Sequence, residues 1–359
     1  MHDSNLKGLI LAAGLGTRLR PLTSLRPKPT ITVANSPLIH YAIDDLIDAG
    51  VHDIGIVVSH DTIDAIKETV EGYRDARYSF VLQDPPQGLA HAVLVAREFL
   101  ADDPFVMYLG DNLFEHGITP FVDTFRSNPE AACVLALVRV EDPRAFGVAV
   151  IEDGRITRLV EKPSDPPSDL AVAGVYVFDA RIHDAIDGME RGAKGEYQIT
   201  DAIARLIERG LAVLPQEVTG WWKDTGKPED ILDANRLELL SRRRQVEGTV
   251  EESQLVGDVV VMPGATVRRS TVFGPALIGA DALVEDAYVG PFTTLGDGVQ
   301  LIDAEVEYSV VGPRCTIRDV GARIQASLLG EDVVVEGASR RPGTHRLVLG
   351  DKSRIDLQQ

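Results

Sequence analysis

The chain has 359 residues, of which 44% are hydrophobic and 25% charged, a composition typical of a soluble globular protein long enough for two domains. A net charge of −19 excludes the broad basic surface of a nucleic-acid-binding protein, and no apolar run reaches the roughly 18 residues that a membrane span needs. The first residues lack the layout of a signal peptide, and Cys133 and Cys315 show no metal or redox spacing. We therefore expect a cytoplasmic protein with no nucleic-acid or membrane partner.

Strand-like and helix-like segments alternate over residues 1–245, which predicts a Rossmann-like α/β domain with a mixed, mostly parallel sheet. Ligands of open α/β sheets bind beyond the carboxyl ends of strands, so the turn at Gly14 and the turn at Asp111 are expected at one edge. A hairpin is predicted at Asp153-Gly154, and Arg242 to Arg244 are interpreted as a solvated helix end. Strands are predicted at 8–12, 54–58, 105–109 and 172–178, and helices at 37–49, 88–99 and 229–244.

The texture changes in residues 246–359, where long helical patterns give way to aliphatic residues and short turns. Steps of six residues connect Val256 with Met262, Ile278 with Val284, and Val289 with Leu295. A six-residue period is typical of a parallel β-helix, in which each hexapeptide forms one side of a triangular coil. The phase slips several times, so some coils should have shortened corners or insertions. The alternative for this domain is a small β-sandwich.

The motif with the clearest chemistry follows the first predicted strand. Leu-Ala-Ala-Gly-Leu-Gly-Thr-Arg at 11–18 brings two glycines close to Arg18, and Lys28 follows ten residues later. Glycines let backbone N–H groups approach phosphate oxygens, and the two cations add fixed positive charge. The motif lacks the third glycine of a dinucleotide fingerprint and the Gly-Lys-Ser/Thr of a P-loop. It predicts a phosphate site of a different kind.

At this point the chain resembles the sugar-1-phosphate nucleotidylyltransferases, and among them the long-form glucose-1-phosphate thymidylyltransferases that append a left-handed β-helix. The resemblance extends over essentially the whole chain. Besides the glycine-rich turn, its blocks are Gln-Asp-Pro-Pro-Gln-Gly-Leu-Ala-His-Ala (83–92), Tyr-Leu-Gly-Asp-Asn (108–112), Phe-Gly-Val (146–148), Glu-Lys-Pro (161–163), Gly-Glu-Tyr-Gln-Ile-Thr-Asp (195–201) and Trp-Trp-Lys-Asp-Thr-Gly (221–226).

The resemblance implies a nucleotide site, in which Gln83 and the backbone at Gly88 recognise the base. A Gln amide can donate one hydrogen bond to a pyrimidine and accept another, and uracil offers the same partners as thymine. His91 is interpreted as a structural or surface residue. The expected nucleotide-binding residues are Leu11, Ala13, Gly14, Gly16, Thr17, Arg18, Lys28, Gln83, Gly88 and Asp111.

It also implies a sugar-phosphate site, with Lys162 on the phosphate, and a Mg²⁺ ion held by Asp111 and Asp224. Two carboxylates suit Mg²⁺, whose remaining ligands come from phosphates and water. Each assignment has a purely structural alternative. Asp111 could cap a turn, Glu161 and Lys162 could form a solvent-exposed ion pair, and Trp222 could pack in the core. The expected sugar-phosphate-binding residues are Asn112, Gly147, Glu161, Lys162, Val172 and Trp222, and the expected catalytic residues are Arg18, Lys28, Asp111, Lys162 and Asp224.

The activity implied is transfer of a nucleoside monophosphate from dTTP (or UTP) to glucose 1-phosphate, by in-line attack on the α-phosphorus. Arg26-Pro27-Lys28-Pro29-Thr30 departs from the Ser-Lys-Gln-Leu of short thymidylyltransferases. A uridylyl- or guanylyltransferase acting on another sugar phosphate therefore stays open. So do a bifunctional enzyme with a β-helix acyltransferase, for which His345 is the candidate base, and a non-catalytic regulatory subunit. A homo-oligomer is expected, because the stacked coils need covering.

Overall fold

The computed structural model describes residues 6–14, 16–24, 26–192 and 195–337. The chain divides into two compact units, Met1–Ser241 and Arg242–Gln359. The division of the activity between domains 1–245 and 246–359 stays a prediction. Within the described ranges, no helix has the length and apolar character needed to cross a membrane.

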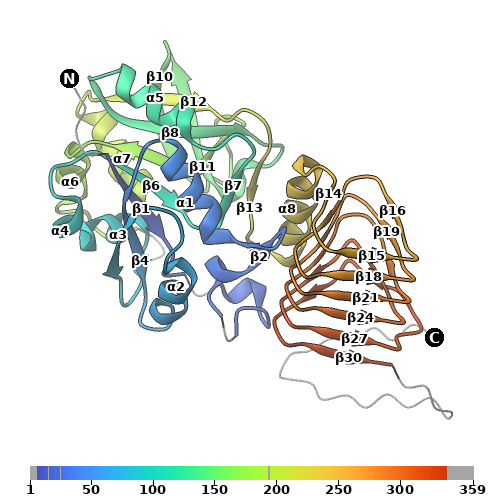
Figure 1. Ribbon diagram of the computed structural model, residues 1–359. Coiled ribbons are helices and arrows are strands. Elements are labelled where there is room, and N and C mark those ends of the chain that lie inside the picture. The colour runs from blue at the N-terminus through green and yellow to red at the C-terminus, as the bar shows by residue number, and fades with distance from the viewer. Residues whose placement is uncertain (1–5, 15, 25, 193–194, 338–359) are drawn as a thin grey trace. The chain divides into compact units, whose positions relative to one another are not determined.

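The first unit is built on a nine-stranded sheet with the order β10-β9-β11-β6-β1-β4-β5, to which β8 is added through β11 and β12 through β8 (Figure 1). It is parallel from β6 to β5, whereas β11 runs antiparallel to β6 and β8, so the mixed Rossmann-like sheet is confirmed. The strands are β1 (Lys7–Leu11), β4 (Asp53–Val58), β5 (Arg77–Leu82), β6 (Phe105–Leu109), β8 (Ala131–Arg139), β9 (Gly147–Glu152), β10 (Arg155–Glu161), β11 (Leu170–Phe178) and β12 (Ala212–Glu217).

Helices cover both faces of this sheet, and the alternation of side chains along β1 separates the two cores. Ile10 packs with α1, α2 and α5, whereas Leu9 packs on the opposite face with α3, α6 and α7. Both residues are fully buried, as expected for a strand covered on both faces. The helices are α1 (Leu38–Asp48), α2 (Ile63–Val70), α3 (Leu89–Val95), α4 (Arg97–Leu100), α5 (Thr119–Ser127), α6 (Arg181–Ile186), α7 (Ile199–Glu208) and α8 (Pro228–Ser241).

Two helix predictions need correction. The segment 88–99 forms two helices, α3 and α4, separated at Ala96. Val93, Ala96 and Leu100 are all buried, so the apolar spacing continues through the break and does not reveal it. The helix expected to reach Arg244 ends at Ser241 instead, and the Arg244 backbone N–H donates to Asp258 Oδ1 at 3.1 Å.

Short elements complete the first unit. The β9–β10 hairpin turns at Asp153 and Gly154, both with positive φ, as predicted. The pair β7–β13 is antiparallel and joins Asn112 to Asp224. The remaining elements are β2 (Thr32–Val33), β3 (Ser36–Pro37), β7 (Asn112–Phe114), β13 (Trp222–Asp224) and the 3₁₀ turns η1 (Thr17–Leu19), η2 (Lys28–Thr30) and η3 (Pro143–Ala145).

The second unit is the expected left-handed β-helix, in which three parallel sheets form the sides of stacked coils (Figure 1). Its first sheet contains β14 (Gln245–Val246), β17 (Val259–Val261), β20 (Ala276–Ile278), β23 (Thr293–Leu295), β26 (Val310–Val311) and β29 (Leu328–Leu329). The second contains β15 (Thr249–Glu251), β18 (Thr266–Arg268), β21 (Leu283–Glu285), β24 (Gln300–Ile302), β27 (Thr316–Arg318) and β30 (Val334–Glu336). The third contains β16 (Gln254–Val256), β19 (Thr271–Phe273), β22 (Tyr288–Val289), β25 (Glu305–Glu307) and β28 (Ile324–Gln325).

The register of these sheets explains the slipping six-residue period. Val267 pairs with Val284 and Val284 with Leu301, a step of 17 residues rather than three full hexapeptides. Later steps shorten to Ile317 and then lengthen to Val335. The paired aliphatic residues form one continuous buried core along the coil axis. The β-sandwich alternative is therefore wrong.

Candidate active site

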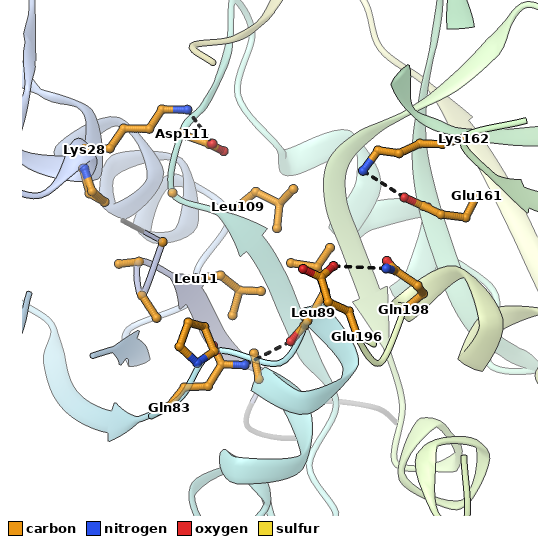
Figure 2. Close-up of a pocket in the computed structure, with 18 residues that line it drawn as sticks. Leu11, Lys28, Gln83, Leu89, Leu109, Asp111, Glu161, Lys162, Glu196 and Gln198 are labelled. Carbon is orange, nitrogen blue, oxygen red and sulfur yellow. Dashed lines mark hydrogen bonds and ion pairs between the residues drawn. The ribbon is translucent and has the colours of Figure 1, made fainter. Parts of the chain in front are cut away.

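A cavity of about 430 Å³ opens at the carboxyl ends of β1 and β6, the edge where the sequence placed both motif turns. Figure 2 shows Lys28 and Asp111 on one side of it and Glu161 and Lys162 on the other, with Gln83 and Leu89 at a third side. The lining residues are Leu11, Ala12, Ala13, Gly14, Lys28, Pro29, Gln83, Pro86, Gly88, Leu89, Ala92, Leu109, Gly110, Asp111, Glu161, Lys162, Glu196 and Gln198.

The two motif glycines have different tasks. A Cβ added at Gly14 would meet no atom within 4 Å, so its missing side chain leaves free space at the cavity wall. Gly16 has a φ of 58°, a conformation that favours glycine, and a Cβ there would lie 3.0 Å from the Cβ of Lys28. Gly16 therefore lets the turn pack against η2, which carries Lys28 to the cavity.

Lys28 links the two carboxylates that the sequence assigned to a metal. Its Nζ lies 2.6 Å from Asp111 Oδ2 and 3.8 Å from Asp224 Oδ1. Burial, and then the negative charge of Asp111, raise the pKa of Asp224 to about 6, against the opposing effect of Lys28. Two carboxylates that disfavour each other's charge create a place where an added cation is stabilised.

The Asp-Thr-Gly turn after β13 holds this arrangement in place. The backbone N–H of Thr225 donates to the carbonyl oxygen of Asp111 at 3.0 Å, and Thr225 Oγ1 donates to the same oxygen at 2.8 Å. A Cβ at Gly226 would lie 3.3 Å from Arg18 Nη1, so the absent side chain lets the guanidinium approach the turn. Arg18 thereby acts on Asp224 electrostatically, lowering its pKa together with Lys28.

The donor set suits Mg²⁺ only if other ligands complete it. Asp111 and Asp224 supply carboxylate oxygens, the ligands that Mg²⁺ prefers. In the described part of the chain, no three His, Cys, Asp or Glu side chains come close enough together to hold a metal by themselves. The pair therefore fits a Mg²⁺ ion that keeps water and substrate phosphates as its remaining ligands.

Asn112 connects Trp222 with Asp111. Trp222 Nε1 donates to Asn112 Oδ1 at 2.7 Å, and Asn112 Nδ2 donates to Asp111 Oδ1 at 2.8 Å. Asn112 is buried and lies outside the cavity lining, as does Trp222, whose ring packs edge-on against Phe146. In this structure both side chains therefore support Asp111 instead of facing the cavity directly.

The opposite wall is formed where β10 ends. Lys162 has a φ of 43°, and its Nζ lies 3.1 Å from Glu161 Oε1. Thr200 Oγ1 donates to Glu161 Oε2 at 3.1 Å, so this carboxylate has a second partner besides Lys162. Gly147 and Val172 lie behind it, since a Cβ at Gly147 would be 3.6 Å from Glu161 Oε2 and 3.5 Å from Val172 Cγ2.

Gln83 follows β5, and its side chain is hydrogen-bonded to the loop at Gly88, the residue expected to recognise the base together with it. Its Nε2 donates to the Gly88 carbonyl oxygen at 3.0 Å and lies 3.1 Å from His91 Nδ1 (the first bond is drawn in Figure 2). Both amide N–H bonds are thus used within the protein. In this arrangement the amide oxygen is the atom left to interact with a ligand, and the pairing of this amide with a base stays a prediction.

The sequence-based set falls into two groups. The cavity lining includes Leu11, Ala13, Gly14, Lys28, Gln83, Gly88, Asp111, Glu161 and Lys162. Outside the lining lie Gly16, Thr17, Arg18, Asn112, Gly147, Val172, Trp222 and Asp224, of which Thr17 is part of the η1 turn. The expected set omitted Pro86, Leu89, Glu196, Gln198 and Thr225, although the 83–92, 195–201 and 221–226 blocks contained them. His345 lies outside the described residues.

Comparison with known proteins places the chain in one family. The family model described as nucleotidyl transferase matches residues 7–240. A glucose-1-phosphate thymidylyltransferase from Streptomyces antibioticus is 42% identical over 98% of this chain and 100% of its own, and one from Streptomyces griseus is 45% identical over 98% and 99%. A crystal structure of UDP-glucose pyrophosphorylase with UDP-glucose shares 26% identity with a TM-score of 0.60, covering 67% of this chain and 100% of that one. The chain belongs to the nucleotidyl transferase family, among the sugar-1-phosphate nucleotidylyltransferases.

Proposed function

We propose that the chain transfers dTMP from dTTP to glucose 1-phosphate, producing dTDP-glucose and pyrophosphate. The observation that carries the proposal is the placement of two lysines, Lys28 and Lys162, on opposite sides of one cavity at the carboxyl end of the sheet. Each can bind one phosphate group, so that the two substrates meet between them. Relatives with this printed activity match over 98% of the chain.

The reaction needs positioning and charge neutralisation rather than covalent chemistry. A phosphate oxygen of glucose 1-phosphate attacks the α-phosphorus of dTTP in line, and the bond between the α-phosphorus and the bridging oxygen breaks as pyrophosphate leaves. The attacking oxygen is already anionic at neutral pH, so the step requires no general base. Lys28 and Arg18 serve the triphosphate, and Lys162 serves the sugar phosphate, which Glu161 helps to place through the sugar hydroxyls.

Asp111 and Asp224 are the residues that would hold Mg²⁺, on the fit described above. A bound Mg²⁺ ion supplies positive charge to the phosphate oxygens as negative charge builds up on the leaving pyrophosphate. Lys28 Nζ lies 2.6 and 3.8 Å from the same two carboxylates, close to where that positive charge would act.

A pyrophosphate-release assay tests the proposal directly. Five nucleotides (dTTP, UTP, GTP, ATP and CTP) are crossed with the 1-phosphates of glucose, galactose, mannose and N-acetylglucosamine. We expect dTTP with glucose 1-phosphate to give the highest kcat/KM, with UTP within about 200-fold, the range that one methyl group can supply. A preference for GTP, or no release from any pair, would reject the assignment.

We propose that the second unit assembles the enzyme into a homo-oligomer and has no catalytic activity of its own. Among the described coils, β28, β29 and β30 pair on one side only, and such strand edges are commonly covered by another subunit. Light scattering of the full chain should give a mass above the 38.9 kDa of a monomer. Acetyl transfer from acetyl-CoA to an amino-sugar phosphate by the intact protein would instead assign an activity to the coils.

We also propose a cytoplasmic location. Cys133 and Cys315 are both buried free thiols, which fits a reducing compartment. Burial raises the pKa of each thiol, so both are poorly reactive as nucleophiles.

A further inference from the structure

The amide of Gln83 has its orientation fixed by the protein. The Gly88 carbonyl oxygen can only accept a hydrogen bond, so the atom 3.0 Å from it must be the NH₂ nitrogen of Gln83 and not its oxygen. Gly88 packs closely against the Tyr197 backbone: its φ is 104°, and a Cβ there would lie 2.5 Å from the Tyr197 carbonyl oxygen. The Tyr197 N–H donates to Gln87 O, and the Ala90 N–H donates to Tyr197 O, which ties this loop to the Tyr197 segment.

The orientation of Gln83 in turn identifies the protonation state of His91 that matches it. His91 Nδ1 lies 3.1 Å from Gln83 Nε2, which only donates, so Nδ1 must accept and the ring is neutral with its proton on Nε2. The imidazole stacks on Tyr197 with centroids 6.2 Å apart, and the Arg191 guanidinium lies over the same tyrosine ring. Burial lowers the pKa of His91, and the charge of Arg191 lowers it further, which favours the neutral ring.

With both N–H bonds occupied, Oε1 is the polar atom of the Gln83 side chain that remains for a ligand, and no described residue donates to it. Gln83 lines the cavity, so this acceptor belongs to the wall that a nucleobase would contact. A bare acceptor favours a base edge with a ring N–H. Thymine and uracil present such an N3–H, whereas the N3 of cytosine is itself an acceptor and would face Oε1 with repulsion.

We propose that His91 is a specificity-determining positioning residue, which holds the Gln83 amide so that the site selects bases with a ring N–H and rejects cytosine. The inference rests on the proposed function, since it places a pyrimidine nucleotide in this cavity. His91 does not contact the base in this scheme and acts only through Gln83.

Two substitutions at one position separate this role from simple packing. His91→Asn places an acceptor, Oδ1, where Nδ1 stood, and His91→Phe keeps a ring against Tyr197 but offers no acceptor. Binding of dTTP and dCTP to the full-length chain is measured by calorimetry with Mg²⁺ and no sugar phosphate. We expect the dTTP-to-dCTP affinity ratio to fall roughly threefold to tenfold in His91→Phe, the range of one hydrogen bond, and to be retained in His91→Asn.

The pH dependence provides a second readout. Protonation turns His91 Nδ1 into a donor that repels the Gln83 NH₂ group, so the wild-type ratio should fall as the pH is lowered below 6.5, the ordinary pKa of an imidazole. Both nucleotides carry the same triphosphate, whose protonation cancels in the ratio. The other groups facing this ring are the Tyr197 phenol and the Arg191 guanidinium. Because its acceptor does not titrate there, His91→Asn should show no such fall.

Three outcomes would overturn the inference: an unchanged ratio in His91→Phe, an equal loss in His91→Asn and His91→Phe, or a wild-type chain that binds dCTP as tightly as dTTP. The proposed function is judged separately by pyrophosphate release. A chain that binds dTTP selectively through His91 but releases no pyrophosphate would retain this inference and lose the proposed function.

Discussion

The indole N–H of Trp222 and the amide oxygen of Asn112 lie 2.7 Å apart, and this contact sets the direction of the whole Asn112 amide. Its NH₂ group is thereby turned toward Asp111 Oδ1, at 2.8 Å. The space that Asn112 occupies exists because Gly174 has no side chain: a Cβ there would lie 2.7 Å from Asn112 Oδ1. Three residues, Asn112 on β7, Gly174 on β11 and Trp222 on β13, therefore set the position of the Asp111 carboxylate, which we propose binds the metal.

Gly174→Ala should displace Asn112 and lower kcat. Misplacing a group next to the chemistry by about 1 Å can cost on the order of 100-fold, so we expect a 10- to 100-fold loss in pyrophosphate release. The matched control is Gly154→Ala, because Gly154 has a φ of 75°, close to the 76° of Gly174, but free space around its Cβ. Both variants should lose some thermal stability from the strained φ, and only the first should lose turnover. Equal activity in the two would contradict the role of Gly174.

The parts of the site that could be predicted from the sequence are those carried by local pattern. The strand before Gly14 and the strand before Asp111 are short apolar runs ending in turns, and both were placed correctly at one edge of the sheet. The turn at Asp153-Gly154 was likewise predicted correctly from its two residues and the strand-like segments on either side.

The supporting contacts could not be predicted, because they join residues far apart in the chain. Thr225 reaches Asp111 across 114 positions, and Trp222 reaches Asn112 across 110. The orientation of Gln83 depends on a backbone carbonyl and on a histidine tautomer, neither of which leaves a signal in residue type. The break at Ala96 was missed for a related reason, since burial continues across it.

The metal assignment predicts that Asp111→Asn and Asp224→Asn each lower kcat by on the order of 100-fold or more, comparable with the loss of one electrostatic contact to a transition state. Each change removes a negative charge that the cation needs while keeping the size of the side chain. Asp53→Asn is the control, since Asp53 lies at the opposite end of β4 and pairs with Arg77. The measurement is turnover against Mg²⁺ concentration. Near-normal turnover of Asp111→Asn at saturating Mg²⁺ would reject the assignment.

The two cavity lysines should differ in the substrate that they serve. Lys162→Ala is expected to raise the KM for glucose 1-phosphate, on the order of tenfold or more for a lost charged contact, with a much smaller effect on dTTP. Lys28→Ala should mainly weaken dTTP, because Lys28 lies beside Asp111 on the side of the glycine-rich turn. Steady-state kinetics with each substrate varied in turn gives both values. Equal losses for both substrates in either variant would show that the phosphates share one site.

The stability of the first unit should depend on pH because α1 carries a buried carboxyl that contacts β6. Asp45, on α1, accepts a hydrogen bond from Tyr108 at 2.7 Å. Burial is the largest cause that raises the pKa of Asp45 to about 7, the Tyr108 bond opposes it, and the charges of Asp48, Asp44 and Glu238 add to it. Below pH 3.8, the ordinary pKa, the carboxyl is protonated in both the folded and the unfolded chain, so it does not reduce the free energy of unfolding. Between pH 3.8 and about 7 the carboxyl ionises in the unfolded chain but stays protonated in the folded one, so the stability of the fold decreases. Above about pH 7 the loss of stability is complete.

Asp45→Asn mimics the protonated carboxyl and keeps an oxygen for Tyr108, so it should remove this loss of stability. A rise from 3.8 to about 7 corresponds to roughly 4 kcal/mol, which is an upper bound for the gain. We expect a higher Tm than the wild type at pH 8 and only about a quarter of that gain near pH 4.5, measured by scanning calorimetry. Asp44→Asn is the control one residue earlier, since Asp44 pairs with Arg74 and Tyr73 and should lose stability at pH 8. An equal rise in Tm for Asp45→Asn at both pH values would show that ionisation of this carboxyl is not the cause. The rise would then come from a change in packing around Tyr108.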